Sequence, residues 1–292
     1  MRWISFTRGS LLRGAGYTLF TLGVFLFSLW RLLPYPELSR NLESRLLSEG
    51  IAARIEGLGP GAFPGVRART VRLAPANGPE WGLDLHDAQV GFPLRSLVRG
   101  QPIVAVDART LGGGVSARLS LGSTPRASLE WADVDLSRLR LPPALSELPL
   151  AGEASGQLEA EVRKTAPINS GGRTDITFQD VRIGAGKAFG FPVPPVGLGN
   201  GRLRLVADGG RLEVESAVFE GGDLGVELSG SVLLRPDPTR SLVNGVLSLR
   251  PDDQVSQDLA LLFAIFPGAR ASDGRYTARI RGTLGAPRLL AR

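Results

Sequence analysis

The sequence predicts a mainly β protein that is attached to a membrane by one N-terminal helix. Residues 14–30 form a run of seventeen positions without a charged side chain. From Ile51 onward, apolar residues alternate with polar ones at a period of two, and glycine-rich stretches separate these segments. Such alternation is typical of antiparallel sheets with one wet and one dry face. We therefore expect a single transmembrane helix followed by a long antiparallel, amphipathic sheet.

The N-terminal run is long enough to span a bilayer. A span needs about 20 mostly apolar residues, and residues 15–33 reach that length if the Arg31 side chain extends toward the headgroups. A cleaved signal peptide is the alternative interpretation. Residues 31–39, however, offer no small-x-small cleavage site. We therefore expect residues 15–33 to be an uncleaved anchor.

The charges around the run predict its orientation. Arg2, Arg8 and Arg13 precede it, and the positive-inside rule places such residues in the cytoplasm. Residues 1–14 are therefore expected to be cytoplasmic, and the chain after the anchor is expected to lie in the periplasm. The sequence thus predicts a single-pass protein of the bacterial inner membrane.

A second helix is predicted directly after the anchor, within residues 34–50. Leu38, Leu42 and Leu46 are spaced four residues apart and share one helix face. Gly50 is a suitable residue to end the helix. A partner-binding coiled coil is the alternative, but three leucines are too few heptads for a zipper. We expect an amphipathic linker helix that packs on the domain behind it.

Residues 51–292 form the predicted periplasmic β domain, with a possible sub-boundary at residues 164–173. Glycine pairs or triplets mark the expected turns at residues 112–114, 171–172, 209–210 and 221–222. Short capping helices are expected at residues 93–99, 136–148 and 252–266. The apolar positions of the alternating strands form a candidate core face or groove: Val115, Leu119, Leu158, Val162, Leu224, Val226 and Ile280.

The composition offers little chemistry for catalysis. The chain has no cysteine and one histidine, His86, which alternation places on the polar side of a strand. A nucleophilic triad needs a base beside a serine or cysteine nucleophile, and no serine signature accompanies Asp84 and Asp87. Asp252 and Asp253 leave only a weak possibility for a divalent cation. We expect neither an enzyme, nor a resident metal, nor a cofactor.

The basic balance of the chain, with a pI of about 10.6, does not indicate nucleic acid binding. A nucleic-acid interface gathers its arginines into a patch with stacking aromatic residues. Here the arginines alternate with Glu, Ser and Thr along strands. No nucleic-acid partner is expected.

Six segments of the chain carry a likeness to a known family. They are the anchor, the helix at residues 38–47, residues 57–67, the strand at residues 66–73, the hairpin at residues 111–115 and residues 273–287. In their order and spacing, these segments resemble protein N of the bacterial type II (general) secretion pathway over nearly the whole chain. The chain also resembles the broader AsmA-like group, in which an anchor leads into an amphipathic β groove and a G-x-L-x-x-P element closes the domain.

The resemblance implies a non-catalytic, inner-membrane-anchored accessory component of type II protein secretion, and it transfers no site residues. Two mechanisms remain open. The sheet could be a scaffold that binds other secretion components along its edges or loops, or its dry face could be a groove that carries lipid acyl chains. We favour the scaffold and expect Val226 and Ile280 to be packed core. The discriminating feature is whether the dry face is covered.

Overall fold

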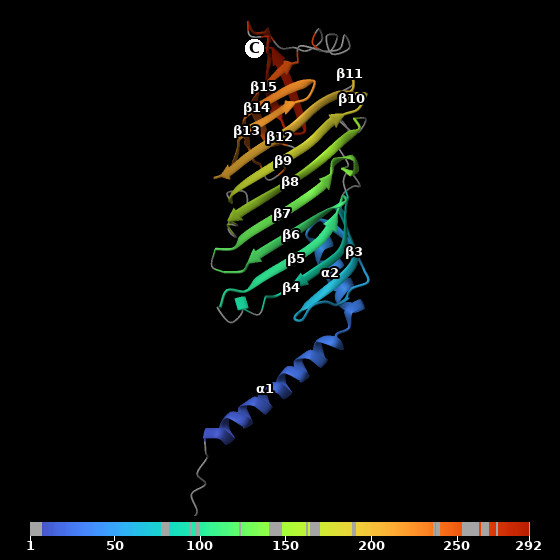
Figure 1. Ribbon diagram of the computed structural model, residues 1–292, viewed down its shortest axis with the longest axis vertical. Helices are drawn as coiled ribbons and strands as arrows, with labels where there is room; N and C mark the ends of the chain where they lie inside the picture. Colours follow the sequence, from blue (N-terminus) through green and yellow to red (C-terminus); the bar gives the residue numbers. More distant parts are fainter. Residues whose placement is uncertain are drawn as a thin grey trace, which may run out of the picture.

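The computed structural model shows one large antiparallel sheet preceded by two helices (Figure 1). It describes residues 8–291 apart from residues 77–81, 94, 97–99, 123, 140–147, 162, 164–169, 189–190, 236, 238–239, 253–262, 264–268 and 273. Helix α1 (Arg8–Arg31) extends away from the sheet, and helix α2 (Tyr35–Ser48) follows it. Within the described residues, no helix combines the length and the apolar character that a membrane crossing requires.

Helix α2 ends as its sequence predicts. Gly50 has φ 84°, the left-handed conformation that glycine adopts most readily, and its N–H donates to the Leu47 carbonyl at 3.0 Å. The helix then covers the edge of the sheet, because the Ile55 N–H donates to Glu43 Oε1 at 2.6 Å. An otherwise open edge strand is thereby given a side-chain partner.

The strands follow one another along the sheet almost in chain order, as a series of hairpins. The order is β1-β3-β4-β5-β6-β7-β8-β9-β12-β13-β14-β15-β17-β16, with β2 paired to β3 and β18 paired to β17. A small hairpin, β10-β11, forms a separate ladder. The bounds are β1 (Ile51–Glu56), β2 (Gly59–Pro60), β3 (Gly65–Pro75), β4 (Leu83–Gly91), β5 (Ile103–Thr110), β6 (Gly113–Ser120), β7 (Arg126–Asp135), β8 (Leu150–Glu161), β9 (Gly171–Ile183), β10 (Gly186–Ala188), β11 (Phe191–Val193), β12 (Val196–Asp208), β13 (Arg211–Gly221), β14 (Leu224–Leu233), β15 (Leu242–Pro251), β16 (Ala269–Arg270), β17 (Tyr276–Thr283) and β18 (Ala286–Ala291).

The register separates the alternating residues into rows that cross many strands, because directly paired residues share a face. One row is mostly apolar and runs through Val66, Val90, Val106, Ala117, Leu129, Leu158, Thr174, Leu205 and Val214. The neighbouring row is polar and runs through Arg67, Gln89, Asp107, Ser116, Glu130, Gln157, Asp175, Arg204 and Ser216. The sheet therefore has one apolar and one polar face.

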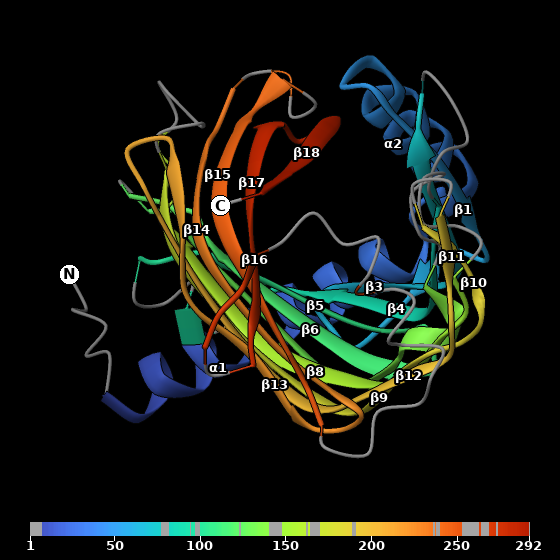
Figure 2. The ribbon, with the colours of Figure 1, turned by 90° about the horizontal axis from the view of Figure 1, so that it is seen from above.

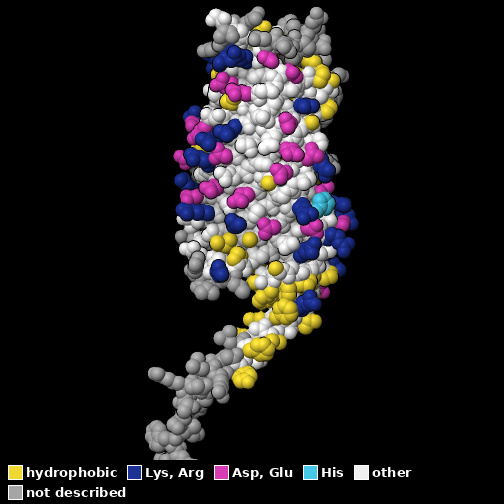
Figure 3. Space-filling view, viewed as in Figure 1, with side chains coloured by type: hydrophobic (Ala, Val, Ile, Leu, Met, Phe, Trp, Pro, Cys, Tyr) yellow, Lys and Arg dark blue, Asp and Glu magenta, His cyan; other side chains and the backbone are white. Residues whose placement is uncertain are grey.

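The sheet curls into an open half-pipe, with β14 and β15 on one side and β1 on the other (Figure 2). Its outer face carries Lys, Arg, Asp and Glu side chains scattered among other polar groups, and few apolar ones (Figure 3). The apolar rows consequently line the inside of the curve. We call these two surfaces the inner face and the outer face.

Two of the expected turns differ from the structure. Gly171 and Gly172 lie within β9 and pair with Glu161 and Ala160 of β8. A side chain at Gly172 would place its Cβ 2.9 Å from the Glu159 carbonyl oxygen, so glycine serves close strand contact there rather than a turn. Likewise, Gly113 and Gly114 already belong to β6, and the expected 112–114 turn is shorter than predicted.

Some sequence expectations fall largely outside the described residues. Within the predicted capping helices, helical conformation is seen at residues 95–96, at the 3₁₀ turn η1 (Leu136–Arg138) and at Phe263. Of the possible sub-boundary, residues 171–173 lie in β9, whose direct pairing with β8 makes the sheet continuous there. Residues 164–169 lie outside the described part of the chain.

Candidate functional site

Six of the seven residues singled out in the sequence lie on the inner face. Val115 pairs with Trp131, Leu158 with Leu129 and Val226 with Leu249, and each pair belongs to the apolar rows. Leu119, Leu224 and Ile280 occupy the same face of β6, β14 and β17. Val162 lies outside the described residues.

One margin of the inner face is covered. Leu224 and Leu249 are each 7% exposed and pack with Val196 and Phe263, while Val226 packs against this cluster from the side. The Phe263 ring stacks on Tyr276 with centroids 4.3 Å apart. A residue from the predicted 252–266 helix therefore closes the sheet at this end.

The same margin continues onto β8 and β9. Leu136 of η1 packs with Ala154 and Val181, and the Asp135 carboxylate holds η1 by accepting from the Ser137 N–H at 2.9 Å. Hydrogen bonds from Ser137 lower the pKa of Asp135. We call the two clusters together the closed rim; its members are Leu136, Ala154, Val181, Val196, Leu224, Leu249 and Phe263.

The middle of the inner face is different. Val106, Ala117, Leu129, Leu158 and Leu205, which we call the open floor, are all half-buried. Among the described elements, the main contacts between a helix and the sheet are those of α2 with the edge strand β1 and of η1 with β8, where Leu136 packs on Ala154. The open floor is thus apolar surface with solvent access.

The indole ring of Trp131 covers part of the inner face next to the open floor. The Trp131 side chain lies across Gly156 on the next strand, where an added Cβ would meet the indole at 2.5 Å. Gly156 and Trp131 are directly paired. A flat indole resting on a glycine leaves a smooth apolar surface, which suits contact with a chain-like ligand.

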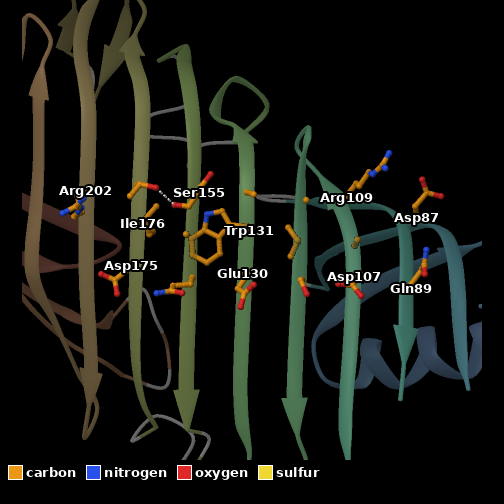
Figure 4. A pocket seen from close by; sticks show the side chains of 18 of the residues that line it. Asp87, Gln89, Asp107, Arg109, Glu130, Trp131, Ser155, Asp175, Ile176 and Arg202 are labelled. Carbon is orange, nitrogen blue, oxygen red and sulfur yellow. Dashed lines mark hydrogen bonds between the residues drawn. The ribbon is translucent and has the colours of Figure 1, made fainter. Parts of the chain in front are cut away.

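The outer face carries a shallow trough of about 1000 Å³. Its lining includes the small residues Gly114, Ala132 and Ser155 together with charged side chains. Figure 4 shows Asp107, Glu130 and Asp175 on separate strands, with Arg109 and Arg202 on β5 and β12. Because both signs of charge are present and exposed, the trough has no strong preference for one charge.

Two ion pairs organise this trough. Arg67 Nη2 donates to Asp87 Oδ1 at 2.6 Å, and Arg204 pairs with Asp175 through its Nε. The hydrogen bond from Arg67 lowers the pKa of Asp87, and the hydrogen bond to Asp175 raises the pKa of Arg204. Both pairs lie at the surface. We therefore expect them to keep the outer face soluble and the strands in register, and we assign them no catalytic role.

The residues considered for catalysis are not brought together into a catalytic arrangement. His86 is exposed on the outer face of β4, opposite Thr70 and Arg109. Among the described residues, no group of three or more His, Cys, Asp or Glu side chains is placed to hold a metal ion. Asp253 lies outside the described part of the chain.

Sequence reasoning did not identify the aromatic residues that shape the inner face. Phe178 and Phe219 pack against the closed rim with ring centroids 5.2 Å apart, and Gly201 lies between them in the register. Their alternation with polar residues was visible in the sequence, but their alignment across strands depends on register.

Comparison with known protein families, curated proteins and solved structures gave no match.

Proposed function

We propose that this chain is a membrane-anchored accessory protein that acts by binding, in the manner of protein N of type II secretion. The observation that carries the proposal is the apolar surface of α1. At about 100° per residue, Phe20, Phe25 and Leu26 point to three different sides of this helix, and they are 70%, 61% and 45% exposed. A helix that exposes apolar side chains all round requires an apolar surrounding, which a bilayer supplies.

The attached sheet supports a binding role. It presents a continuous polar outer face and ends in β18, an edge strand with Leu289 and Leu290 41% and 44% exposed. Edge strands with unpaired backbone groups are suited to accept a strand from a partner. We assign the exposed edge of β18 to the binding of other secretion components.

Deletion of the gene in its own bacterium tests this role. We expect normally secreted proteins to accumulate in the periplasm, and plasmid-borne wild-type protein to restore their release into the medium. A variant with Phe20, Phe25 and Leu26 all changed to Ser should fail to restore it and should leave the membrane fraction. Unchanged secretion in the deletion strain would refute the assignment to secretion.

The open floor favours a second candidate function, the binding of lipid acyl chains. Its half-buried Leu129, Leu158 and Leu205 belong to the mostly apolar row of the inner face, and the polar row lies on the opposite face of the sheet. Mass spectrometry of the protein purified in a mild, lipid-free detergent tests this function. Stoichiometric phospholipid or fatty acid would support it, and protein free of lipid would count against it.

A further inference from the structure

An apolar aromatic patch surrounds the point where α1 meets the sheet. The rings of Phe27 and Trp30, both in α1, lie 6.0 Å and 5.5 Å from the ring of Phe63, which belongs to the β domain. Phe92 is adjacent, since its N–H donates to the Pro64 carbonyl at 3.3 Å. We call these four residues the base patch; apolar side chains gather there and continue down α1 (Figure 3).

A hydrogen bond joins α1 to the loop that carries Phe63, and a second one holds that loop. Trp30 Nε1 donates to the Gly65 carbonyl at 2.8 Å, and the same carbonyl accepts from the Gly61 N–H at 3.1 Å. The loop has little room to shift, because a Cβ at Gly65 would lie 2.5 Å from the Val90 carbonyl oxygen. The β domain is therefore held at one height along α1.

The position of Phe63 along α1 indicates how deep this part of the β domain lies relative to the anchor. Phe27 precedes Trp30 by three residues, or about 4.5 Å along the helix axis, so the Phe63 ring lies beside α1 and not beyond its end. Phe63 and Phe92 are nevertheless 44% and 40% exposed, and Phe27 is 48% exposed. If residues 15–33 occupy the bilayer, as proposed for the anchor, then the Phe63 ring lies at the depth of Phe27 and Trp30.

We infer that the base patch is a membrane-embedded surface of the β domain, and that the partner it fits is the interfacial layer of the lipid bilayer. This inference rests on the proposed anchoring by α1. Aromatic side chains are enriched at this depth, where an apolar ring meets polar headgroups. Arg31 and Arg95 are exposed within one and three residues of Trp30 and Phe92, which places cations near the lipid phosphates.

The chain contains no cysteine, so a single introduced thiol can carry an environment-sensitive fluorophore. We would label Ala62→Cys, which directly precedes Phe63, Phe92→Cys in the base patch, Phe20→Cys within α1, and Leu284→Cys in the turn at the opposite end of the sheet order. The full-length protein would be reconstituted in vesicles of phosphatidylethanolamine and phosphatidylglycerol. Nitroxide lipids labelled near the headgroup or deep in the acyl chain would then serve as quenchers.

The expected result is loss of emission at residues 62 and 92 with the shallow quencher, loss at residue 20 with the deep quencher, and no loss at residue 284. Ala62→Cys leaves all four rings in place, so the test does not depend on the folding of the Phe92 variant. If residues 62 and 92 behave like residue 284 while residue 20 is quenched, the inference is wrong and the anchor stands. If residue 20 is not quenched but residues 62 and 92 are, the surface stands and the anchor fails. If none is quenched, both fail.

Discussion

Leu224 and Leu158 lie on the same face of one sheet, yet Leu224 is 7% exposed and Leu158 remains half-buried. Leu224 belongs to the closed rim, where Phe263 covers it, and Leu158 belongs to the open floor. Burying a leucine fully contributes about 1.5–3 kcal/mol. The comparison therefore indicates that the rim supplies stability, whereas the floor keeps part of its apolar surface in contact with solvent.

The largest expected effect is that of a charge in the closed rim. Leu224→Asp should lower the free energy of unfolding by about 4 kcal/mol, because a buried carboxylate would have no compensating partner. Leu158→Asp is the matched control, and its cost should be about 1 kcal/mol since its carboxylate can reach water. Urea unfolding followed by circular dichroism measures both. Equal losses would show that the floor is as well covered as the rim.

Removing the cover of the rim should have the next largest effect. Phe263→Ala deletes a ring that is 7% exposed and stacked on Tyr276, and should cost about 3 kcal/mol. Phe92→Ala is the control, because that ring is 40% exposed; it should cost less than about 1 kcal/mol in detergent. If the two variants unfold at the same urea concentration, Phe263 does not hold the rim together.

The sequence predicted which side chains share a face, because the period of two determines this within each strand. It could not predict which part of that face is covered. Leu224 and Leu158 have the same local pattern, and the difference between them comes from Phe263, which is distant in the sequence. The glycines at residues 171–172 were predicted as a turn for the same reason, because the sequence alone does not distinguish a strand glycine from a turn glycine until the paired strand is known.

The proposed binding of acyl chains by the open floor gives a third prediction, in which a smaller change in free energy is expected. Leu158→Asp should weaken the binding of a fluorescent fatty acid about tenfold, or about 1.4 kcal/mol, because the charge lies in the apolar row. Gln157→Ala changes the adjacent residue on the outer face and should leave binding unchanged. Fluorescence titration of the detergent-solubilised protein measures both. Equal affinity for the wild type and the Leu158 variant would exclude the floor as the binding surface.

The smallest effect is expected on the outer face, where Arg67 lowers the pKa of Asp87. A carboxyl whose pKa is lower in the folded state than in the unfolded state stabilises the fold above its ordinary value of 3.8, and this contribution disappears as the pH falls through the folded pKa. Asp87→Asn should therefore slightly lower the melting temperature at neutral pH, and the difference from the wild type should vanish in strong acid. Asn is the suitable replacement because Asp87 has φ 52°, which Asn tolerates. Asp84→Asn is the control, since its carboxylate is 3.7 Å from Arg72 and should have less effect. A loss at Asp87 that persists unchanged in strong acid would show that its side chain stabilises the sheet by a route other than its charge.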